Sequence, residues 1–213
     1  MGWLFMNRYH MGGHDTPKAY LDAQFTYSRE QDGGGTRGLK VLESACAGNR
    51  VYYAAAQVIE DGKPGDVFAI VCLVRWNPRS TTGDHFGYKD MDESMGPCED
   101  GCPERILSLL TPTTREHALD WRRRCLARLQ KRRRRIEHGM RIKLAQPLTF
   151  TDGHEGDEFI VVKRGGSITF RPADGHGYYR IRNFRDLDWT AVPETKVHRT
   201  LFGAASVPLT ATG

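Results

Sequence analysis

The stretch from Thr113 to Glu137 constrains this chain more than any other, because it carries the net charge of the whole sequence. It holds ten of the 31 lysine and arginine residues and three of the 26 acids, so the rest of the chain is close to neutral. Apolar residues recur in it at the spacing of one helix face. These residues are Ala118, Trp121, Cys125, Leu129 and Ile136. The pattern predicts a long helix with one buried face and a strongly basic remainder.

Residues at both ends of this stretch favour helix termini. Thr113 can cap a free backbone amide while Glu116, three residues later, closes a capping box. Gly139 suits the left-handed conformation that ends many helices. The expected organisation is an N-terminal domain at 1–112, a basic linking helix at 113–138, a second domain at 139–192 and an extended tail at 193–213.

The basic side of the helix is the main candidate binding surface. No acid occurs in the sequence between Arg122 and Arg135, and such a run repels itself unless an anion lies nearby. The expected partner is DNA or RNA, contacted through its phosphates, or an acidic protein surface. A solvated connecting helix is the alternative. The candidate residues are Arg122, Arg123, Arg124, Arg128, Lys131, Arg132, Arg133, Arg134 and Arg135.

The N-terminal half predicts an α+β domain built on an antiparallel sheet. Strand-like runs occupy residues 39–47, 50–60, 66–76 and 85–91, and the second and third are joined by a Gly- and Pro-containing turn. Residues 67–74 are apolar without alternation, as expected for a central strand that is covered on both faces. Helices predicted at 17–27 and 103–110 would supply the two covers.

The C-terminal half predicts a small closed β-barrel of SH3-like type. Five short strand-like runs lie between 140 and 182, separated by turns rich in Gly, Asp and Pro. Aromatic and basic residues near its end can stack on and pair with nucleic acid, although a core tyrosine with solvated arginine neighbours would give the same pattern. The candidate residues on this barrel face are Tyr178, Arg180, Arg182 and Arg185.

A second hypothesis is a small metal-dependent enzyme that acts on an anionic substrate. Carboxylates and imidazoles are common ligands of divalent cations. The candidate metal ligands are His10, His14, Asp90 and Asp92, with Asp15 and Glu93 completing the proposed site. Asp15 or Thr16 can cap the helix that follows, and loop acids are commonly only solvated, so the same residues are explained without chemistry. Cys98 and Cys102 have a zinc-like spacing, but no second cysteine pair supports them.

The remaining motifs limit the function further. No phosphate-binding loop or Gly-x-Ser-x-Gly motif occurs, and the one Gly-x-G-x-x-G match lies in a polar loop before a strand, so no cofactor is expected. No run approaches 18 apolar residues, and the first ten residues lack a signal-peptide core. A cytoplasmic protein without membrane contact is expected. Five cysteines, an odd number, indicate reduced thiols.

Four segments carry a resemblance to known sequences: MGGHDTPKAYLDAQFTY, CLVRWNP, FGYKDMDESMGP and PLTFTDG. Together they resemble an uncharacterised bacterial family of unknown function that is frequent on plasmids and phage-related DNA. The resemblance implies no activity, cofactor or catalytic residue, but it favours a role in nucleic-acid handling or in countering host defence. The leading hypothesis is therefore a non-enzymatic binding protein, a mobile-element accessory or counter-defence protein, that engages nucleic acid or an acidic protein surface through its arginine-rich helix.

Overall fold

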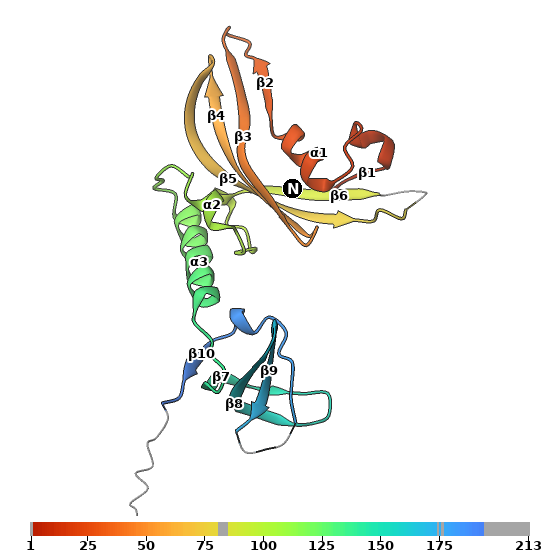
Figure 1. The fold of residues 1–213 in the computed structure, drawn as a ribbon. Helices are drawn as coiled ribbons and strands as arrows, with labels where there is room; N and C mark the ends of the chain where they lie inside the picture. The colour runs from red at the N-terminus through yellow and green to blue at the C-terminus, as the bar shows by residue number, and fades with distance from the viewer. Residues whose placement is uncertain (1, 81–84, 174, 176, 194–213) are drawn as a thin grey trace, which may run out of the picture. The chain divides into compact units, whose positions relative to one another are not determined.

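The chain forms two compact units, Met1–Arg134 and Arg135–Gly213, each with its own sheet (Figure 1). The computed structural model describes residues 2–80, 85–173, 175 and 177–193. The boundary predicted at residue 113 lies inside unit 1, because the basic helix packs on the N-terminal sheet. The predicted tail from residue 194 onward lies outside the described residues.

Unit 1 is built on a six-stranded antiparallel sheet in the order β1-β6-β5-β4-β3-β2. Its strands are β1 (Leu4–Met6), β2 (Tyr27–Glu30), β3 (Thr36–Ala47), β4 (Val51–Glu60), β5 (Lys63–Trp76) and β6 (Phe86–Asp92). The predicted α+β class and antiparallel sheet are confirmed. The two edge strands β1 and β2 were not predicted, since each is too short to show a strand pattern in the sequence.

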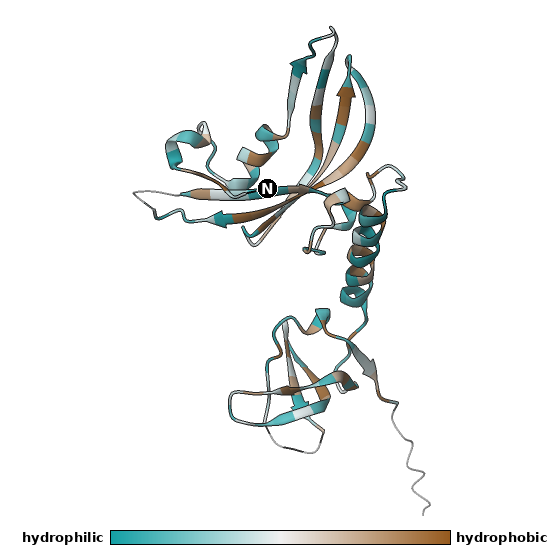
Figure 2. Cartoon of the chain, turned by 180° about the vertical axis from the view of Figure 1, so that it is seen from behind, coloured by the Kyte–Doolittle hydropathy of each residue, from teal (hydrophilic) through white to brown (hydrophobic). Residues whose placement is uncertain are grey.

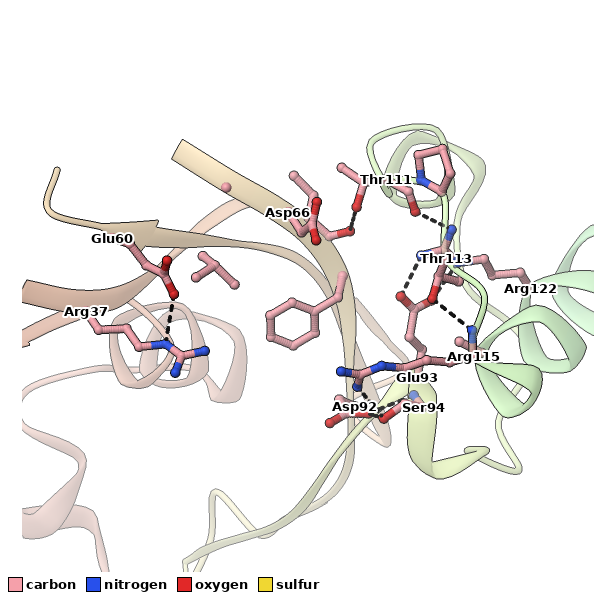
Figure 3. A pocket seen from close by; sticks show the side chains of 16 residues that line it. Arg37, Glu60, Asp66, Asp92, Glu93, Ser94, Thr111, Thr113, Arg115 and Arg122 are labelled. Carbon is pink, nitrogen blue, oxygen red and sulfur yellow. Dashed lines mark hydrogen bonds and ion pairs between the residues drawn. The ribbon is translucent and has the colours of Figure 1, made fainter. Parts of the chain in front are cut away.

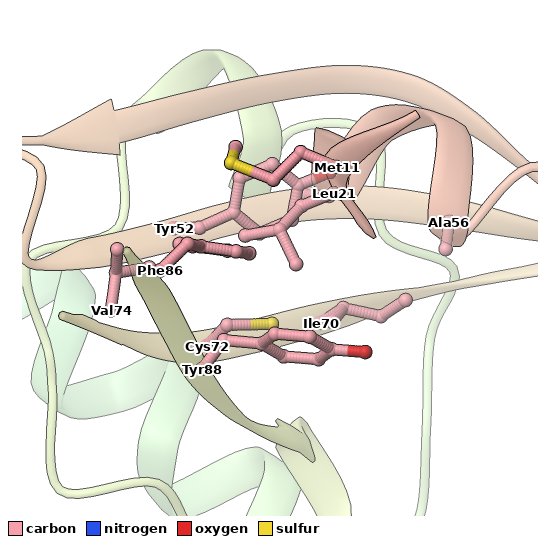
Figure 4. Close-up of a cluster of buried hydrophobic side chains, with 10 residues drawn as sticks. Met11, Leu21, Tyr52, Ala56, Ile70, Cys72, Val74, Phe86 and Tyr88 are labelled. Carbon is pink, nitrogen blue, oxygen red and sulfur yellow. The ribbon is translucent and has the colours of Figure 1, made fainter. Parts of the chain in front are cut away.

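Alternation along the central strands sends apolar side chains to both faces of this sheet. On β4, Tyr52 and Ala54 belong to one buried cluster, while Tyr53 and Ala55 belong to the other. The first cluster is covered by helix α1 (Pro17–Gln24) and the short 3-10 helix η1 (Arg8–Met11), which contribute Leu21 and Met11 (Figure 4). On β5, Cys72 belongs to the first cluster and Val71 to the second, so the prediction that the strand at 67–74 is covered on both faces is confirmed.

The second face is covered by helices α2 (Glu104–Leu107) and α3 (Glu116–Arg133). Trp121 and Cys125 of α3 are fully buried against the sheet. The indole Nε1 of Trp121 donates a hydrogen bond to the backbone oxygen of Glu99 at 2.8 Å, which satisfies a polar group that would otherwise be buried without a partner. The loop from 92 to 103, which contains the 3-10 helix η2 (Glu93–Met95), is thus tied to α3.

Helix α3 begins later than the sequence predicted. Its N-cap is Arg115, and no side chain caps it. The Thr113 hydroxyl instead accepts a hydrogen bond from the Arg115 amide at 3.2 Å, so the expected capping box does not form. The chain leaves the helix after Arg133, and Gly139 takes the predicted left-handed conformation, with φ 80°, several residues further on. None of the described helices is both long and apolar enough to cross a membrane.

Unit 2 contains a four-stranded antiparallel sheet in the order β10-β7-β8-β9. Its elements are β7 (Arg141–Thr149), β8 (Glu155–Arg164), β9 (Ser167–Pro172), the 3-10 helix η3 (Phe184–Asp186) and β10 (Trp189–Ala191). The strand predicted at 178–182 is wrong, because only Tyr179 forms a bridge, to Phe170. The fourth strand is β10, and the closed SH3-like barrel is not confirmed. A core that includes Phe159, Phe170 and Trp189 lies under the sheet.

Candidate functional site

Three of the nine predicted binding residues on the basic helix point into unit 1. Arg122 donates from Nε and Nη2 to the two carboxylate oxygens of Glu93, at 2.7 and 2.6 Å, and from Nη1 to the Thr111 backbone oxygen at 2.7 Å. Glu93 is only 4% exposed. A buried carboxylate requires such a partner, because an unpaired charge there would be costly. Arg122 therefore serves the fold.

Arg124 and Arg128 have the same orientation. Arg124 donates to the backbone oxygen of Pro97 at 2.8 Å and to the Asp120 carboxylate at 3.1 Å. Arg128 forms an ion pair with Asp100. With Arg122, these side chains hold the loop before α2 against the helix, which explains part of the basic run without an external partner.

The outward charge lies on the other residues of the run. The Arg123 side chain is 74% exposed and the Arg133 side chain 62% exposed, although Arg133 contacts Glu104. Arg132 is also exposed, whereas Lys131 and Arg134 are half-buried. Figure 2 shows that α3 is mainly hydrophilic over its length. The exposed charge is therefore concentrated in the last turn of α3, where cations also complement the helix dipole.

The basic run continues beyond the end of the helix. The Arg135 side chain is 87% exposed and lies 2.7 Å from Glu137. Such an exposed pair contributes little free energy and exchanges readily with another anion. Five consecutive basic residues, Lys131 to Arg135, thus occupy the last turn of the helix and the positions just after it, with no acid among them.

In unit 2, the predicted residues Tyr178, Arg180, Arg182 and Arg185 are all exposed. Tyr178 is 54% exposed, and the guanidinium of Arg164 lies 5.1 Å from the centre of its ring. Arg185 belongs to η3 and not to a strand. Tyr178 is thus a surface residue, and the alternative that it belongs to the core is wrong.

The neighbouring Tyr179 points elsewhere. Its ring lies 4.0 Å from that of Phe150, and its hydroxyl donates to the Asp152 carboxylate at 2.8 Å. A hydrogen bond from the His154 amide, together with the one from Tyr179, lowers the pKa of Asp152, and the same Asp152 contact raises the pKa of Tyr179. This cluster fixes the chain next to Tyr178.

The predicted metal ligands do not form a cluster that resembles a metal site. Across residues 2–80, 85–173, 175 and 177–193, no group of three or more His, Cys, Asp or Glu side chains is arranged to hold a metal ion. His10 is exposed in η1, and the His14 ring packs edge-on against Tyr20. Asp92 accepts hydrogen bonds from the amide and hydroxyl of Ser94 and so caps η2. Asp90 lies on β6.

Asp15, Cys98 and Cys102 were also considered in the metal-site hypothesis. The helix cap that the sequence assigned to Asp15 or Thr16 is made by Thr16, which accepts from the Ala19 amide at 3.2 Å. Asp15 is exposed. Cys98 is exposed and Cys102 is buried in the second core cluster.

A hollow of about 530 Å³ lies in unit 1 beside the start of β5 (Figure 3). Phe68 and Val58 supply apolar lining, and the walls carry several charged side chains. These charges largely satisfy one another through three sets of contacts. The sets are Arg37 with Glu60, Arg122 with Glu93, and Arg115 with Ser94, which in turn donates to Asp92. Asp66 is the charged lining residue without such a contact among the described residues. Three arginines and four carboxylates line the hollow, so it has no excess of positive charge that would attract an anion.

Sequence reasoning missed the acidic residues that neutralise the inner side of α3. It also missed several basic residues of the unit 2 sheet. Glu93 and Asp100 lie in loop-like sequence, where nothing marks them as partners of a helix that follows later. The bases were detectable, since the alternation in EFIVVKR places Arg164 on the same side as Ile160 and Val162.

Residues 112–184 match the model of one family, described as a domain of unknown function (DUF6927). The match covers about a third of the chain, including α3 and the strands β7 to β9. No curated protein and no solved structure matches the chain significantly. The family match agrees with an uncharacterised family and assigns no activity.

Proposed function

We propose that this protein binds nucleic acid without sequence specificity. The contacts are made by the basic residues in and after the last turn of helix α3. The observation that carries the proposal is the run Lys131 to Arg135, in which Arg132, Arg133 and Arg135 are exposed and no acid interrupts the charge. Regularly spaced phosphates are the anions that such a run fits best. The resemblance to proteins of plasmids and phage-related DNA supports a role at mobile DNA.

The division of labour along α3 also supports this proposal. The arginines that contact the loop before α2 occur early in the helix, at 122, 124 and 128, and they are paired inside unit 1. The exposed bases occur later. Their ion pairs, Arg133 with Glu104 and Arg135 with Glu137, involve exposed side chains, so a phosphate can replace the acid at little cost.

The test compares affinities for a fluorescently labelled 20-nucleotide single strand and a 20-base-pair duplex at low salt. Replacement of Arg132, Arg133 and Arg135 with Gln should weaken binding of both nucleic acids. Each lost arginine removes a phosphate contact, while Gln preserves helix propensity. A matched variant replaces Arg8, Lys40 and Arg50, three exposed bases elsewhere in unit 1, with Gln. It carries the same charge change and should bind almost as tightly as the unaltered protein.

Two outcomes would overturn the proposal. Equal losses in both variants would mean that net charge alone attracts the nucleic acid. No binding by the unaltered protein would exclude nucleic acid and leave an acidic protein surface as the partner of the helix.

A further inference from the structure

The outward face of the second sheet is defined by its strand register. Phe159 and Val161 of β8 are fully buried in the core, so the residues that alternate with them lie on the opposite face. Ile160 is paired with Arg141 of β7 and Arg171 of β9. By the same pairing, the outward face comprises Arg141, Lys143, Glu158, Ile160, Val162, Arg164, Thr169 and Arg171.

This face combines an apolar centre with a basic edge. Ile160 and Val162 are half-buried. On the β7 side, Glu158 contacts both Arg141 and Lys143, at 3.1 and 3.3 Å. On the β9 side, Arg164 and Arg171 form no ion pair with any residue that the structure describes. The side of the face toward β9 is therefore positively charged.

Tyr178 joins this basic edge. The antiparallel bridge between Phe170 and Tyr179, with hydrogen bonds of 2.8 and 2.9 Å, places Tyr178 next to Arg171. Tyr179 faces Phe150 and the core, so Tyr178 faces the other way, toward Arg164. The guanidinium of Arg164 lies against the ring while more than half of Tyr178 stays exposed, at 54%.

We propose that this face, with Tyr178, Arg164 and Arg171 at its centre, is a platform for single-stranded nucleic acid. A base stacks on Tyr178, and Arg164 and Arg171 contact the adjoining phosphates. An aromatic ring flanked by guanidinium groups next to an apolar strip matches the alternating chemistry of base and phosphate. In a duplex the faces of the bases are stacked on each other, so the platform prefers single strands.

The platform rests on the nucleic-acid function proposed above but uses different residues, on the sheet of unit 2. Replacement of Tyr178 with Ala should weaken binding of a 20-nucleotide single strand about 5- to 150-fold, the range that corresponds to loss of one stacked base. Duplex affinity should stay within about twofold. Tyr178→Trp should restore single-strand binding, because the larger ring also stacks. Tyr9→Ala is the matched control, since Tyr9 is a tyrosine of unit 1 that is 93% exposed.

A direct readout of stacking separates this role from a structural one. A single strand that contains 2-aminopurine should lose fluorescence on binding to the unaltered protein and to Tyr178→Trp, but keep it on binding to Tyr178→Ala. Arg164→Gln should weaken single-strand binding while the quenching at saturation is retained. Circular dichroism melting of each variant shows whether unit 2 is still folded.

The results distinguish the platform from the helix. If Tyr178→Ala binds single strands as tightly as the unaltered protein, and the helix variant binds weakly, the platform is overturned and the helix function stands. If Tyr178→Ala weakens binding and the helix variant does not, the platform stands and the helix function fails. Equal losses for single strand and duplex in Tyr178→Ala would also overturn the platform.

Discussion

The Glu93 carboxylate and the Arg122 guanidinium meet at two points, Oε1 to Nη2 at 2.6 Å and Oε2 to Nε at 2.7 Å. This geometry lets one arginine satisfy both oxygens of a buried carboxylate. The contact also shows that the early arginines of α3 stabilise the fold of unit 1. Among the basic residues from 122 to 135, Arg123 and those in and after the last turn of α3 are left to present charge to solvent.

Loss of Arg122 should therefore destabilise unit 1. Arg122→Gln leaves the Glu93 charge buried without its partner, and removal of one member of a buried pair typically costs about 3–5 kcal/mol. We expect the free energy of unfolding, measured in urea, to fall by about this amount. Arg123→Gln is the control, because the Arg123 side chain is 74% exposed, and its effect should stay within about 0.5 kcal/mol. Similar effects of the two changes would contradict the structural role of Arg122.

Trp121 should be the main apolar anchor of α3. It is fully buried, and its indole nitrogen is bonded to the Glu99 backbone oxygen. Trp121→Ala should lower the free energy of unfolding by about 3–5 kcal/mol, as large-to-small changes in a core do. Leu126→Ala, at a helix residue that is 49% exposed, should have a much smaller effect. Denaturation of both variants, followed by circular dichroism, tests this. A change below about 1 kcal/mol for Trp121→Ala would show that α3 is not anchored there.

The thiols should differ sharply in reactivity. Burial raises the pKa of Cys125 to about 11, and it also raises the pKa values of Cys72 and Cys102. Cys98 is exposed. Because the thiolate is the reactive form, a thiol reagent at pH 8 should modify Cys98 quickly in the native protein. Mass spectrometry of digests should find Cys72, Cys102 and Cys125 modified only after unfolding. Rapid native labelling of Cys125 would contradict its burial.

The same pKa shift predicts how stability depends on pH. The folded-state pKa of Cys125 is raised from its ordinary value of 9.0, so the folded protein holds this proton more tightly than the unfolded chain. The contribution to stability is complete below about pH 9 and is lost as the pH rises toward about 11. Cys125→Ala should flatten the decline in the free energy of unfolding over this window. An unchanged decline would contradict the assignment.

Periodicity in the sequence was sufficient to predict the central strands of unit 1 and the burial of Ala118, Trp121 and Cys125 on one face of α3. Ile136, predicted on the same face, follows the helix and is buried in the core of unit 2. Strands β3 to β6 lie within three residues of their predicted limits, because their apolar patterns are long and bounded by turns. The two edge strands β1 and β2 and the fourth strand of unit 2, β10, were missed. Each has three or four residues, too few to show an alternating pattern. The strands β1 and β10 also pair with strands far away in the sequence, β6 and β7, which local patterns do not reveal.

The candidate site was predictable only in part. Composition located the basic helix, but it could not show that Arg122, Arg124 and Arg128 are paired with backbone and acids 20 to 30 residues earlier in the chain. Tyr178 was identified as a surface candidate from its basic neighbours. Its partner Arg164 was not, since the contact between them depends on the bridge from Tyr179 to Phe170.

The salt dependence of nucleic-acid affinity tests the central claim most directly. If the run from Lys131 to Arg135 contacts about five phosphates, the logarithm of the association constant should fall with the logarithm of salt concentration at a slope of roughly −3.5 to −4.5. Replacement of Arg132, Arg133 and Arg135 with Gln should reduce the steepness by about two to three. Identical slopes for the two proteins, or no binding by the unaltered protein at about 50 mM salt, would contradict the claim.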